Sequence, residues 1–172
     1  PFKWPSEIME PTKKYSHQAK LNPKTGGIKG FVSGIPFPDI DKNDPNAGLK
    51  IAWNLYFLTD VLGTEQEFDT GYFRIVDGRK GEERVQSMGW RRSLMSHRVL
   101  PPLPKRPDAE GYSKRTIIFM LAPYDIRGFG TSEYRYDPTE SDVVHFDDAW
   151  AYIPGLRRVR RLSASAHYDN LM

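Results

Sequence analysis

The sequence predicts a mainly β protein of the α+β class, in which a curved antiparallel sheet has one or more short helices over it. Three observations support this fold class. From Glu65 onward, apolar and polar residues alternate with the period of two that is typical of half-buried strands. The 172 residues include 14 prolines and 14 glycines, which interrupt the chain too often for long helices. The best helical spacing of apolar residues lies near 44–63.

The N-terminal third is expected to contain this one helix. Residues 1–30 are polar and broken by proline and glycine, so we expect a lead-in that wraps the surface. A short strand within 30–38 would be ended by its own prolines. Asp44 can then cap a helix that begins at Pro45 and ends near Gly63. We interpret it as a core helix or as a lid across the mouth of a cavity, with the candidate lid residues Trp53, Tyr56 and Phe57.

Six strands are expected after the helix, at residues 67–77, 81–95, 114–123, 130–137, 142–153 and 157–168. Segments 77–81 and 137–142 are rich in turn-forming residues and are expected to connect hairpins. The proline-rich segment 100–112 is expected to be a long loop. No internal repeat or low-complexity tract divides the chain, so a single domain is expected over residues 1–172.

The last hairpin can be predicted in more detail. Pro154 followed by Gly155 fits a type II turn and therefore predicts a tight connection. This turn sets the expected cross-strand pairs, which are Tyr152 with Arg157, Trp150 with Val159, and Asp148 with Arg161. A longer loop would shift that register.

Arginines are concentrated beyond this turn, at positions 157, 158, 160 and 161, in a composition that resembles a nucleic-acid patch. Because alternate strand residues point to opposite faces, the patch is split in two, and Asp147 and Asp148 can neutralise part of each half. The net charge of +3 is also too small to indicate nucleic acid, so we expect no such partner. Arg91, Arg92 and Arg98 are expected to line a solvated strand face.

Several classes of chemistry find no support in the sequence. The absence of cysteine excludes disulfides, thiolate metal sites and cysteine nucleophiles. There is no HExxH, GxSxG, P-loop or dinucleotide motif, so we expect no catalytic residue, metal or cofactor. A hydrolase would have to use His145 and Asp147, the only site the sequence suggests for one. No apolar run approaches the roughly 20 residues that a membrane span needs.

Several sequence blocks resemble a known family. Residues 121–136 are similar to a block of the form PxDVRGxG followed by a tyrosine-rich strand, and residues 147–166 are similar to a long block of the form DDxWxYxPxxRRVRR. Gly34-Ile35-Pro36-Phe37-Pro38 and Ala52-Trp53-Asn54 resemble shorter blocks upstream. In this order they resemble the bacterial family known as domain of unknown function 1329.

The resemblance implies a periplasmic protein whose signal peptide has been removed. It implies a relationship to the outer-membrane lipoprotein-sorting carriers LolA and LolB, in which an antiparallel sheet forms an incomplete barrel around an apolar cavity with helices as a lid. Family members often accompany exporters of the resistance–nodulation–division type, and no catalytic residues are established for them. Members continue well past the arginine block, so we expect residues 1–172 to be an incomplete part of a longer domain.

We therefore expect a periplasmic carrier or binding protein for a lipid, lipoprotein or other amphiphile, with an exporter or an outer-membrane component as a partner. The candidate ligand-binding residues are Phe119, Leu121, Tyr134, Tyr136, Phe146, Trp150, Tyr152, Arg157 and Arg161. The aromatic and aliphatic members would form the wall, and the arginines would hold an anionic head group. The alternatives are a structural or adaptor component of an export system without its own ligand and, less favoured, a periplasmic hydrolase.

Overall fold

The computed structural model describes residues 3–61, 65–140 and 145–162. The chain forms two compact units, and each is built from three segments of the sequence. The helical unit contains residues 1–64, 94–114 and 136–145, and the sheet unit contains residues 65–93, 115–135 and 146–172.

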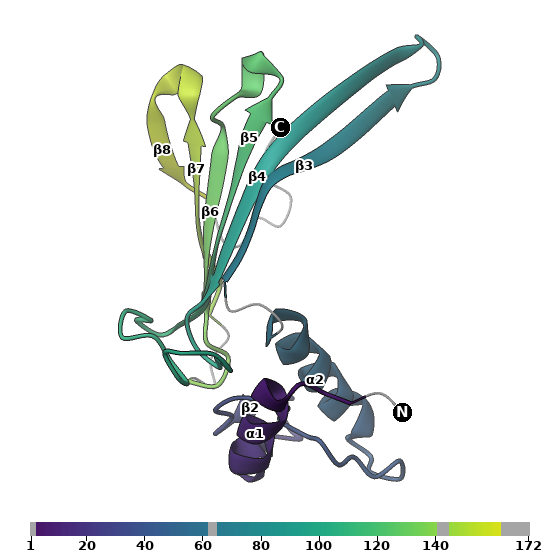
Figure 1. Ribbon diagram of the computed structural model, residues 1–172, viewed down its shortest axis with the longest axis vertical. Coiled ribbons are helices and arrows are strands. Elements are labelled where there is room, and N and C mark those ends of the chain that lie inside the picture. Colours follow the sequence, from purple (N-terminus) through teal and green to yellow (C-terminus); the bar gives the residue numbers. More distant parts are fainter. Residues whose placement is uncertain (1–2, 62–64, 141–144, 163–172) are drawn as a thin grey trace. The chain divides into compact units, whose positions relative to one another are not determined.

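The helical unit contains the two α-helices and a small sheet (Figure 1). Its elements are α1 (Ser6–Tyr15), the 3₁₀ turn η1 (Ser16–Gln18), β1 (Lys20–Leu21), β2 (Ile28–Lys29) and α2 (Ala47–Val61). The two short strands pair antiparallel, with Leu21 opposite Ile28. The loop 95–111 also belongs to this unit. Within the described residues, no helix is long and apolar enough to cross a membrane.

Helix α1 corrects the prediction that residues 1–30 merely wrap the surface. Pro11 lies inside the helix, where it lacks the N–H that would bond to the Glu7 carbonyl, and it suggested a break in the chain. Ile8 and Thr12 lie one turn apart and are both buried. The Thr12 hydroxyl donates to the Ile8 carbonyl at 2.6 Å and accepts from the backbone N–H of Ile35 at 2.8 Å. These contacts fix the helix to the segment around Ile35.

Helix α2 confirms the predicted helix near 44–63. The Asp44 carboxylate accepts the backbone N–H of Asn46 at 2.8 Å and forms an ion pair with Lys50 at 2.5 Å. Lys50 and the Asn46 N–H lower the pKa of Asp44. The strand expected within 30–38 does not form, and all of these residues are described. Their backbone is held by a side chain instead: the Asn54 amide accepts the Phe37 N–H at 2.9 Å and donates to its carbonyl at 2.7 Å.

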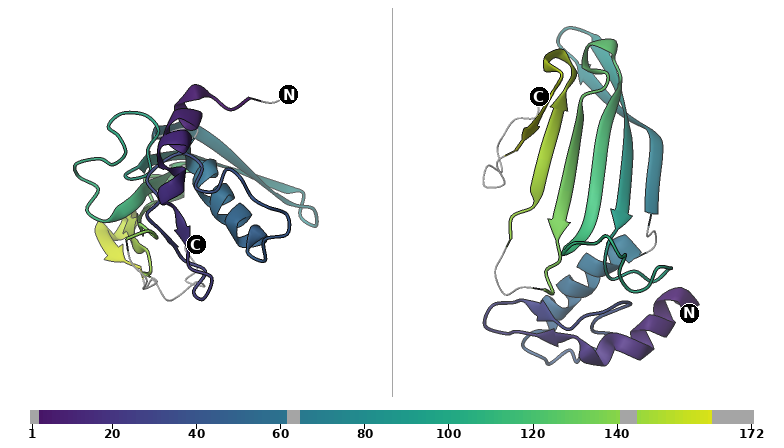
Figure 2. Two further views of the ribbon diagram at one scale, coloured as in Figure 1. Left: turned by 90° about the horizontal axis from the view of Figure 1, so that it is seen from below. Right: turned by 90° about the vertical axis from the view of Figure 1, so that its left-hand side faces the viewer.

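The sheet unit confirms the expected fold class, because its six strands form one antiparallel sheet that does not close (Figures 1 and 2). Each strand lies beside the next strand in sequence. The strands are β3 (Glu65–Asp77), β4 (Glu82–Leu94), β5 (Tyr112–Ala122), β6 (Gly130–Tyr136), β7 (Asp148–Ile153) and β8 (Arg158–Arg161). Strands β3 to β6 agree closely with prediction, whereas parts of the expected strands at 142–153 and 157–168 lie outside the described residues.

The predicted register of the last hairpin is wrong by two residues. Trp150 lies opposite Arg161, and Tyr152 lies opposite Val159. The reason is a longer connection: a 3₁₀ turn, η3 (Pro154–Leu156), is followed by Arg157 in the left-handed conformation with φ of 48°. Because the shift is an even number, every side chain keeps its predicted face.

The sheet unit buries little apolar surface of its own. Among its residues with described burial, only Ser87, Gly89 and Ala151 are buried. Large apolar side chains remain substantially exposed, including Tyr152 at 40% and Val159 at 64%. A sheet that leaves such side chains in water has apolar surface available for a further binding partner.

Candidate ligand-binding face

One face of the sheet gathers most of the predicted aromatic residues. The β6–β7 register sets Gly130 opposite Tyr152 and Ser132 opposite Trp150. Since side chains alternate along a strand, Tyr134 shares this face. The rings of Tyr134 and Trp150 confirm it, because they meet edge to face with 5.1 Å between their centroids.

The same face continues onto β5 and β4 through two arginines. The Arg115 guanidinium lies over the Tyr134 ring, 4.8 Å from its centroid. Phe119 follows four residues later on β5 and so points to the same face. Its ring covers Gly89 of β4, and the Arg91 guanidinium lies 5.7 Å from the ring centroid. We call the set Arg91, Arg115, Phe119, Tyr134, Trp150 and Tyr152 the aromatic face.

The aromatic face is amphipathic. By strand alternation, Ile117 lies between Arg115 and Phe119 on this face, and it is substantially exposed. Val159 extends the apolar surface onto β8. Arg91 and Arg115 place positive charge directly beside the rings of Phe119 and Tyr134. The aromatic face therefore carries apolar surface and positive charge side by side.

The opposite face near these strands is ionic. Arg135 pairs with Glu133 at 2.6 Å and with Asp147 at 2.7 Å. Burial raises the pKa of Glu133, and its hydrogen bond with Asp147 raises it further, while Arg135 acts in the other direction. Small Ala149 and Ala151 complete this part of the face. Charged side chains therefore occupy the part of the opposite face that β6 and β7 form.

Gly89 is expected to be required for the position of Phe119. A Cβ at residue 89 would lie 2.2 Å from the Phe119 Cζ atom, so Gly89→Ala must move the ring. We expect a loss of about 1–3 kcal/mol in the free energy of unfolding, measured by urea denaturation. The loss should shrink in a Phe119→Leu background, and Gly78→Ala, at a turn with open space around the glycine, serves as the control. An equal loss in both backgrounds would contradict the contact.

The structure brings together four of the predicted ligand-binding residues, namely Phe119, Tyr134, Trp150 and Tyr152. Leu121 follows the same alternation and is half-buried. Arg161 lies on this face and forms an ion pair with Asp148. The sequence predicted this pair, although the predicted strand register was wrong. Arg157 sits in the turn and is exposed.

The remaining candidates lie elsewhere. Phe146 is exposed just before β7. Tyr136 belongs to the helical unit. The centroid of its ring lies 4.8 Å from that of Tyr112 and 5.1 Å from that of His145. The candidate lid residues Trp53, Tyr56 and Phe57 pack around Ile28 and Phe31 in the helical unit. Their role as a lid stays a prediction.

The hydrolase candidates do not form a recognisable catalytic pair. His145 is exposed beside Tyr136, and Asp147 is held by Arg135. Within the described residues, no group of three or more carboxylates or imidazoles is placed to hold a metal ion.

A buried ionic network in the helical unit was missed by the sequence analysis. His97 Nε2 lies 2.9 Å from Asp137 Oδ1, and His97 Nδ1 lies 3.1 Å from the Val32 carbonyl. Ser96 Oγ donates to Asp137 Oδ2 at 2.7 Å, and Thr139 donates to Oδ1 through its N–H and its hydroxyl. The contacts of Asp137 with His97 and Ser96, and that of His97 with Val32, join segments at least 40 residues apart in sequence, which alternation patterns do not report.

The hydrogen bonds define the charges in this network. Burial alone would raise the pKa of Asp137, but the His97 hydrogen bond and charge, with those from Ser96 and Thr139, lower it well below its usual range. The carboxylate is therefore ionised and only accepts. His97 Nε2 faces this carboxylate and His97 Nδ1 faces the Val32 carbonyl, so the ring bridges two buried acceptors. His97 and Asp137 form a buried hydrogen-bonded pair.

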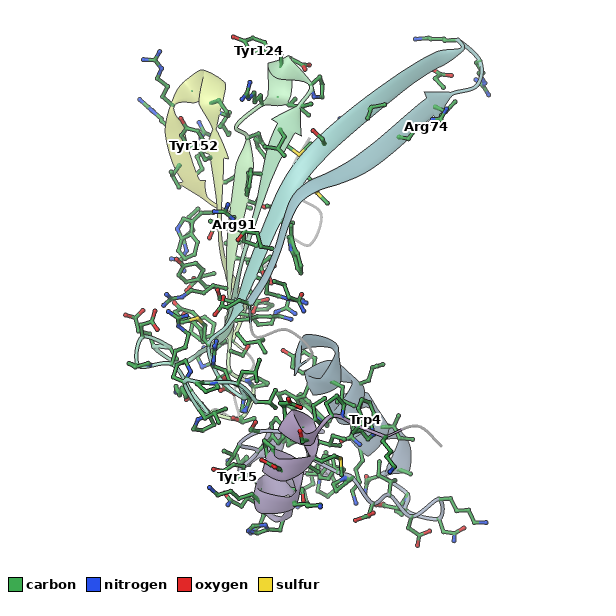
Figure 3. All side chains as sticks on the ribbon, in the orientation of Figure 1. Trp4, Tyr15, Arg74, Arg91, Tyr124 and Tyr152 are labelled. Atoms are coloured by element: carbon green, nitrogen blue, oxygen red, sulfur yellow. The ribbon has the colours of Figure 1, made fainter. Side chains whose placement is uncertain are left out.

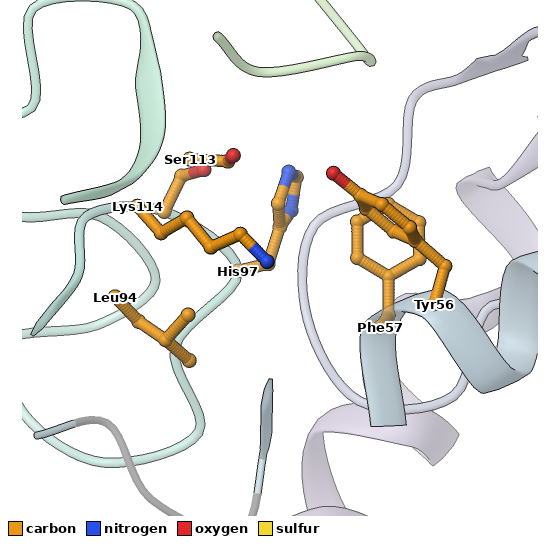
Figure 4. Close-up of a pocket in the computed structure, with 7 residues that line it drawn as sticks. Tyr56, Phe57, Leu94, His97, Ser113 and Lys114 are labelled. Carbon is orange, nitrogen blue, oxygen red and sulfur yellow. The ribbon is translucent and has the colours of Figure 1, made fainter. Parts of the chain in front are cut away.

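The surroundings of this pair are largely apolar. The Phe31 ring stacks on the His97 ring with 4.8 Å between their centroids, and the Phe57 ring meets the His97 ring edge-on with 5.0 Å between centroids. Figure 4 shows His97 between Tyr56 and Phe57 on one side and Ser113 and Lys114 on the other. The pocket that these residues line has a volume of about 20 Å³, enough for a water molecule.

Arg98 corrects another prediction. It was expected on a solvated strand face, but it is 3% exposed in the loop after β4. Its guanidinium donates to the carbonyls of Leu94 at 2.5 Å and Pro101 at 3.1 Å. Its own carbonyl accepts the Ser33 hydroxyl at 2.6 Å. Arg98 is therefore a structural residue that ties the loop to the N-terminal segment.

The described residues thus combine an open antiparallel sheet, one face of which carries aromatic rings and arginines, with a separate helical unit. The chain belongs to the family described as protein of unknown function (DUF1329), whose model matches residues 2–172. A comparison with curated proteins gives no match.

Solved structures include two similar chains. A DUF1329 family protein from Desulfovibrio piger ATCC 29098 is 22% identical with a TM-score of 0.42, over 63% of this chain and 38% of that one. A domain assigned to outer membrane lipoprotein sorting, from Vibrio parahaemolyticus, is 19% identical with a TM-score of 0.38, over 58% of this chain and 32% of that one. The chain thus aligns with well under half the length of either protein.

Proposed function

We propose that the protein binds and carries a lipid, a lipoprotein acyl chain or another amphiphile in the periplasm. The observation that carries the proposal is the aromatic face, where Phe119, Tyr134 and Trp150 are interleaved with Arg91 and Arg115. Covering such a surface with a hydrocarbon chain yields about 25 cal/mol for each Å² of apolar area removed from water.

The arginines of the aromatic face give the proposal its head-group preference. Arg91 also pairs with Glu67 at 2.6 Å, and both side chains are more than half exposed. An exposed ion pair of this kind contributes little stability, so an incoming carboxylate or phosphate can compete for the guanidinium. We therefore propose an anionic amphiphile as the ligand. An inner-membrane exporter or an outer-membrane component would act as the donor or the acceptor.

Trp150→Ala is expected to lower the affinity for a fluorescent fatty acid at least about tenfold, because the ligand loses a large apolar contact. The matched control is Trp90→Ala. Trp90 lies on the opposite side of β4 from Gly89 and Arg91, where its ring carries the Arg92 guanidinium at 4.7 Å. The control should change the affinity less than about twofold. The measurement is a fluorescence titration of the purified protein.

Two results would overturn the proposal. Equal losses of affinity in the two variants would place the ligand away from the aromatic face. An organic extract of the purified protein without any lipid by mass spectrometry, together with no fatty-acid binding, would instead favour a structural or adaptor role in an export system.

A further inference from the structure

Two adjacent hairpin tips end in exposed 3₁₀ turns. The β5–β6 hairpin is closed by η2 (Tyr124–Ile126), and the β7–β8 hairpin is closed by η3. The tips lie side by side at one end of the sheet unit (Figures 1 and 2), and a Cβ at Gly128 would be 3.6 Å from Pro154 Cγ. We call these two turns with their flanking arginines, residues 123–128 and 154–158, the tip surface.

Each turn exposes one large apolar side chain. Tyr124 is 90% exposed at the far end of its hairpin (Figure 3). Leu156 is 52% exposed at the neighbouring tip. Leucine at a turn contributes nothing to a core when it stays in water, and tyrosine is a residue that prefers the boundary between water and hydrocarbon.

The tip surface is also basic. Arg127, Arg157 and Arg158 are all exposed, and within the described part of the chain none of the three forms an ion pair. The acidic residue on these turns is Asp125, so three arginines against one carboxylate leave a net charge of +2. Arg161 is neutralised by its ion pair with Asp148, whereas the charges of these three arginines can attract an external anion.

We propose that the tip surface docks the protein on an anionic phospholipid bilayer. Tyr124 and Leu156 enter the head-group region, and Arg127, Arg157 and Arg158 contact lipid phosphates. A bilayer matches both features at once, because it presents negative charge directly above a hydrocarbon layer. A nucleic acid would use the arginines but not the exposed leucine. The docking goes beyond the proposed carrier function and uses a different surface from the aromatic face.

The test is co-sedimentation with vesicles of phosphatidylcholine, prepared with and without phosphatidylglycerol. The full chain should bind only the vesicles that contain phosphatidylglycerol, and binding should weaken with added salt. Arg127→Gln with Arg158→Gln should weaken the binding about 25-fold, since each basic residue near an anionic surface contributes about fivefold. Tyr124→Ser with Leu156→Ser should weaken the binding that remains at high salt.

The matched control removes the same charge from the helical unit, through Lys24→Gln with Lys42→Gln, two exposed lysines. It should change vesicle binding less than about twofold. An equal loss in this control would overturn the proposal, as would displacement of the protein by free glycerol phosphate, which would indicate a head-group pocket. Binding to an RNA oligonucleotide but not to vesicles would also overturn it.

A further readout separates docking from ligand carriage. The Tyr124→Ser, Leu156→Ser variant should keep the fatty-acid affinity of the unmodified protein while losing vesicle binding. If the variant lost both activities together, the tip surface would be part of the ligand site and the docking proposal would fail. Loss of fatty-acid binding in Trp150→Ala bears only on the carrier function.

Discussion

Asp137→Ala is expected to lower the free energy of unfolding of the helical unit by about 3–5 kcal/mol, because it removes the buried carboxylate that faces His97 Nε2. The same change removes the acceptor for Ser96 Oγ and for both Thr139 donors. Unsatisfied buried donors add to the cost. Urea denaturation followed by circular dichroism measures the loss, and amide hydrogen exchange should show that it falls on the segments around Val32 and Ser96.

Glu140 supplies the matched control for this prediction. It lies three residues after Asp137 and pairs with Lys105, but both side chains of that pair are more than 40% exposed. Glu140→Ala should therefore cost less than about 1 kcal/mol. If the two variants were destabilised equally, the buried pair would contribute no more than an exposed one.

The pH dependence of this effect has a defined sign. The pKa of Asp137 is lowered in the folded protein, so the folded state favours the ionised carboxylate. Its contribution is complete above the ordinary pKa of the aspartate side chain, about 3.9, and is lost as the pH falls through the folded pKa. The difference in stability between the unmodified protein and Asp137→Ala should therefore narrow as the pH falls below about 4.

Gly34→Ala is expected to cost about 3 kcal/mol or more and to detach helix α1. A Cβ at residue 34 would lie 2.5 Å from the Thr12 backbone nitrogen and 2.8 Å from its Cα atom, and backbone atoms of a helix cannot move aside independently. The φ angle of 89° adds strain, since only glycine adopts it readily. Denaturant midpoints and amide exchange across residues 6–15 provide the measurement.

The same substitution at Gly48 is the control. Gly48 lies in helix α2, and a Cβ there would meet no atom within 4 Å. Alanine is the better helix former, so Gly48→Ala should raise the stability by about 0.5–1 kcal/mol. A loss at Gly34 no larger than the change at Gly48 would show that the contact with Thr12 is unimportant.

The sequence predicted the sheet well because strand alternation is a local signal. The sequences of β3 to β6 alternate between apolar and polar residues, and glycine or proline marks most of their ends. Helix α1 escaped prediction because Pro11 interrupts a pattern that rests on two buried residues. The last register depended on the backbone conformation of Arg157, which its residue type does not indicate.

The candidate site was predicted in part for the same reason. Alternation correctly placed Trp150 and Tyr152 on one face, and it separated them from Asp147. It gave no information about Arg115 and Arg91, whose positions over aromatic rings arise from pairing between strands. The His97–Asp137 pair was hidden because 40 residues separate its members, and only tertiary structure brings them together.

The composition of the helical unit from three segments has a consequence for folding. The hydrogen bond from Ser33 to Arg98 spans 65 residues of sequence, and the contact of His97 with Asp137 spans a further 40. Contacts of such high sequence separation form slowly, because a long loop must close before they are gained. Helices α1 and α2 therefore reach their full packing only after the segments around Arg98 and Asp137 have folded against the N-terminal segment, which makes them late elements in the folding of the helical unit.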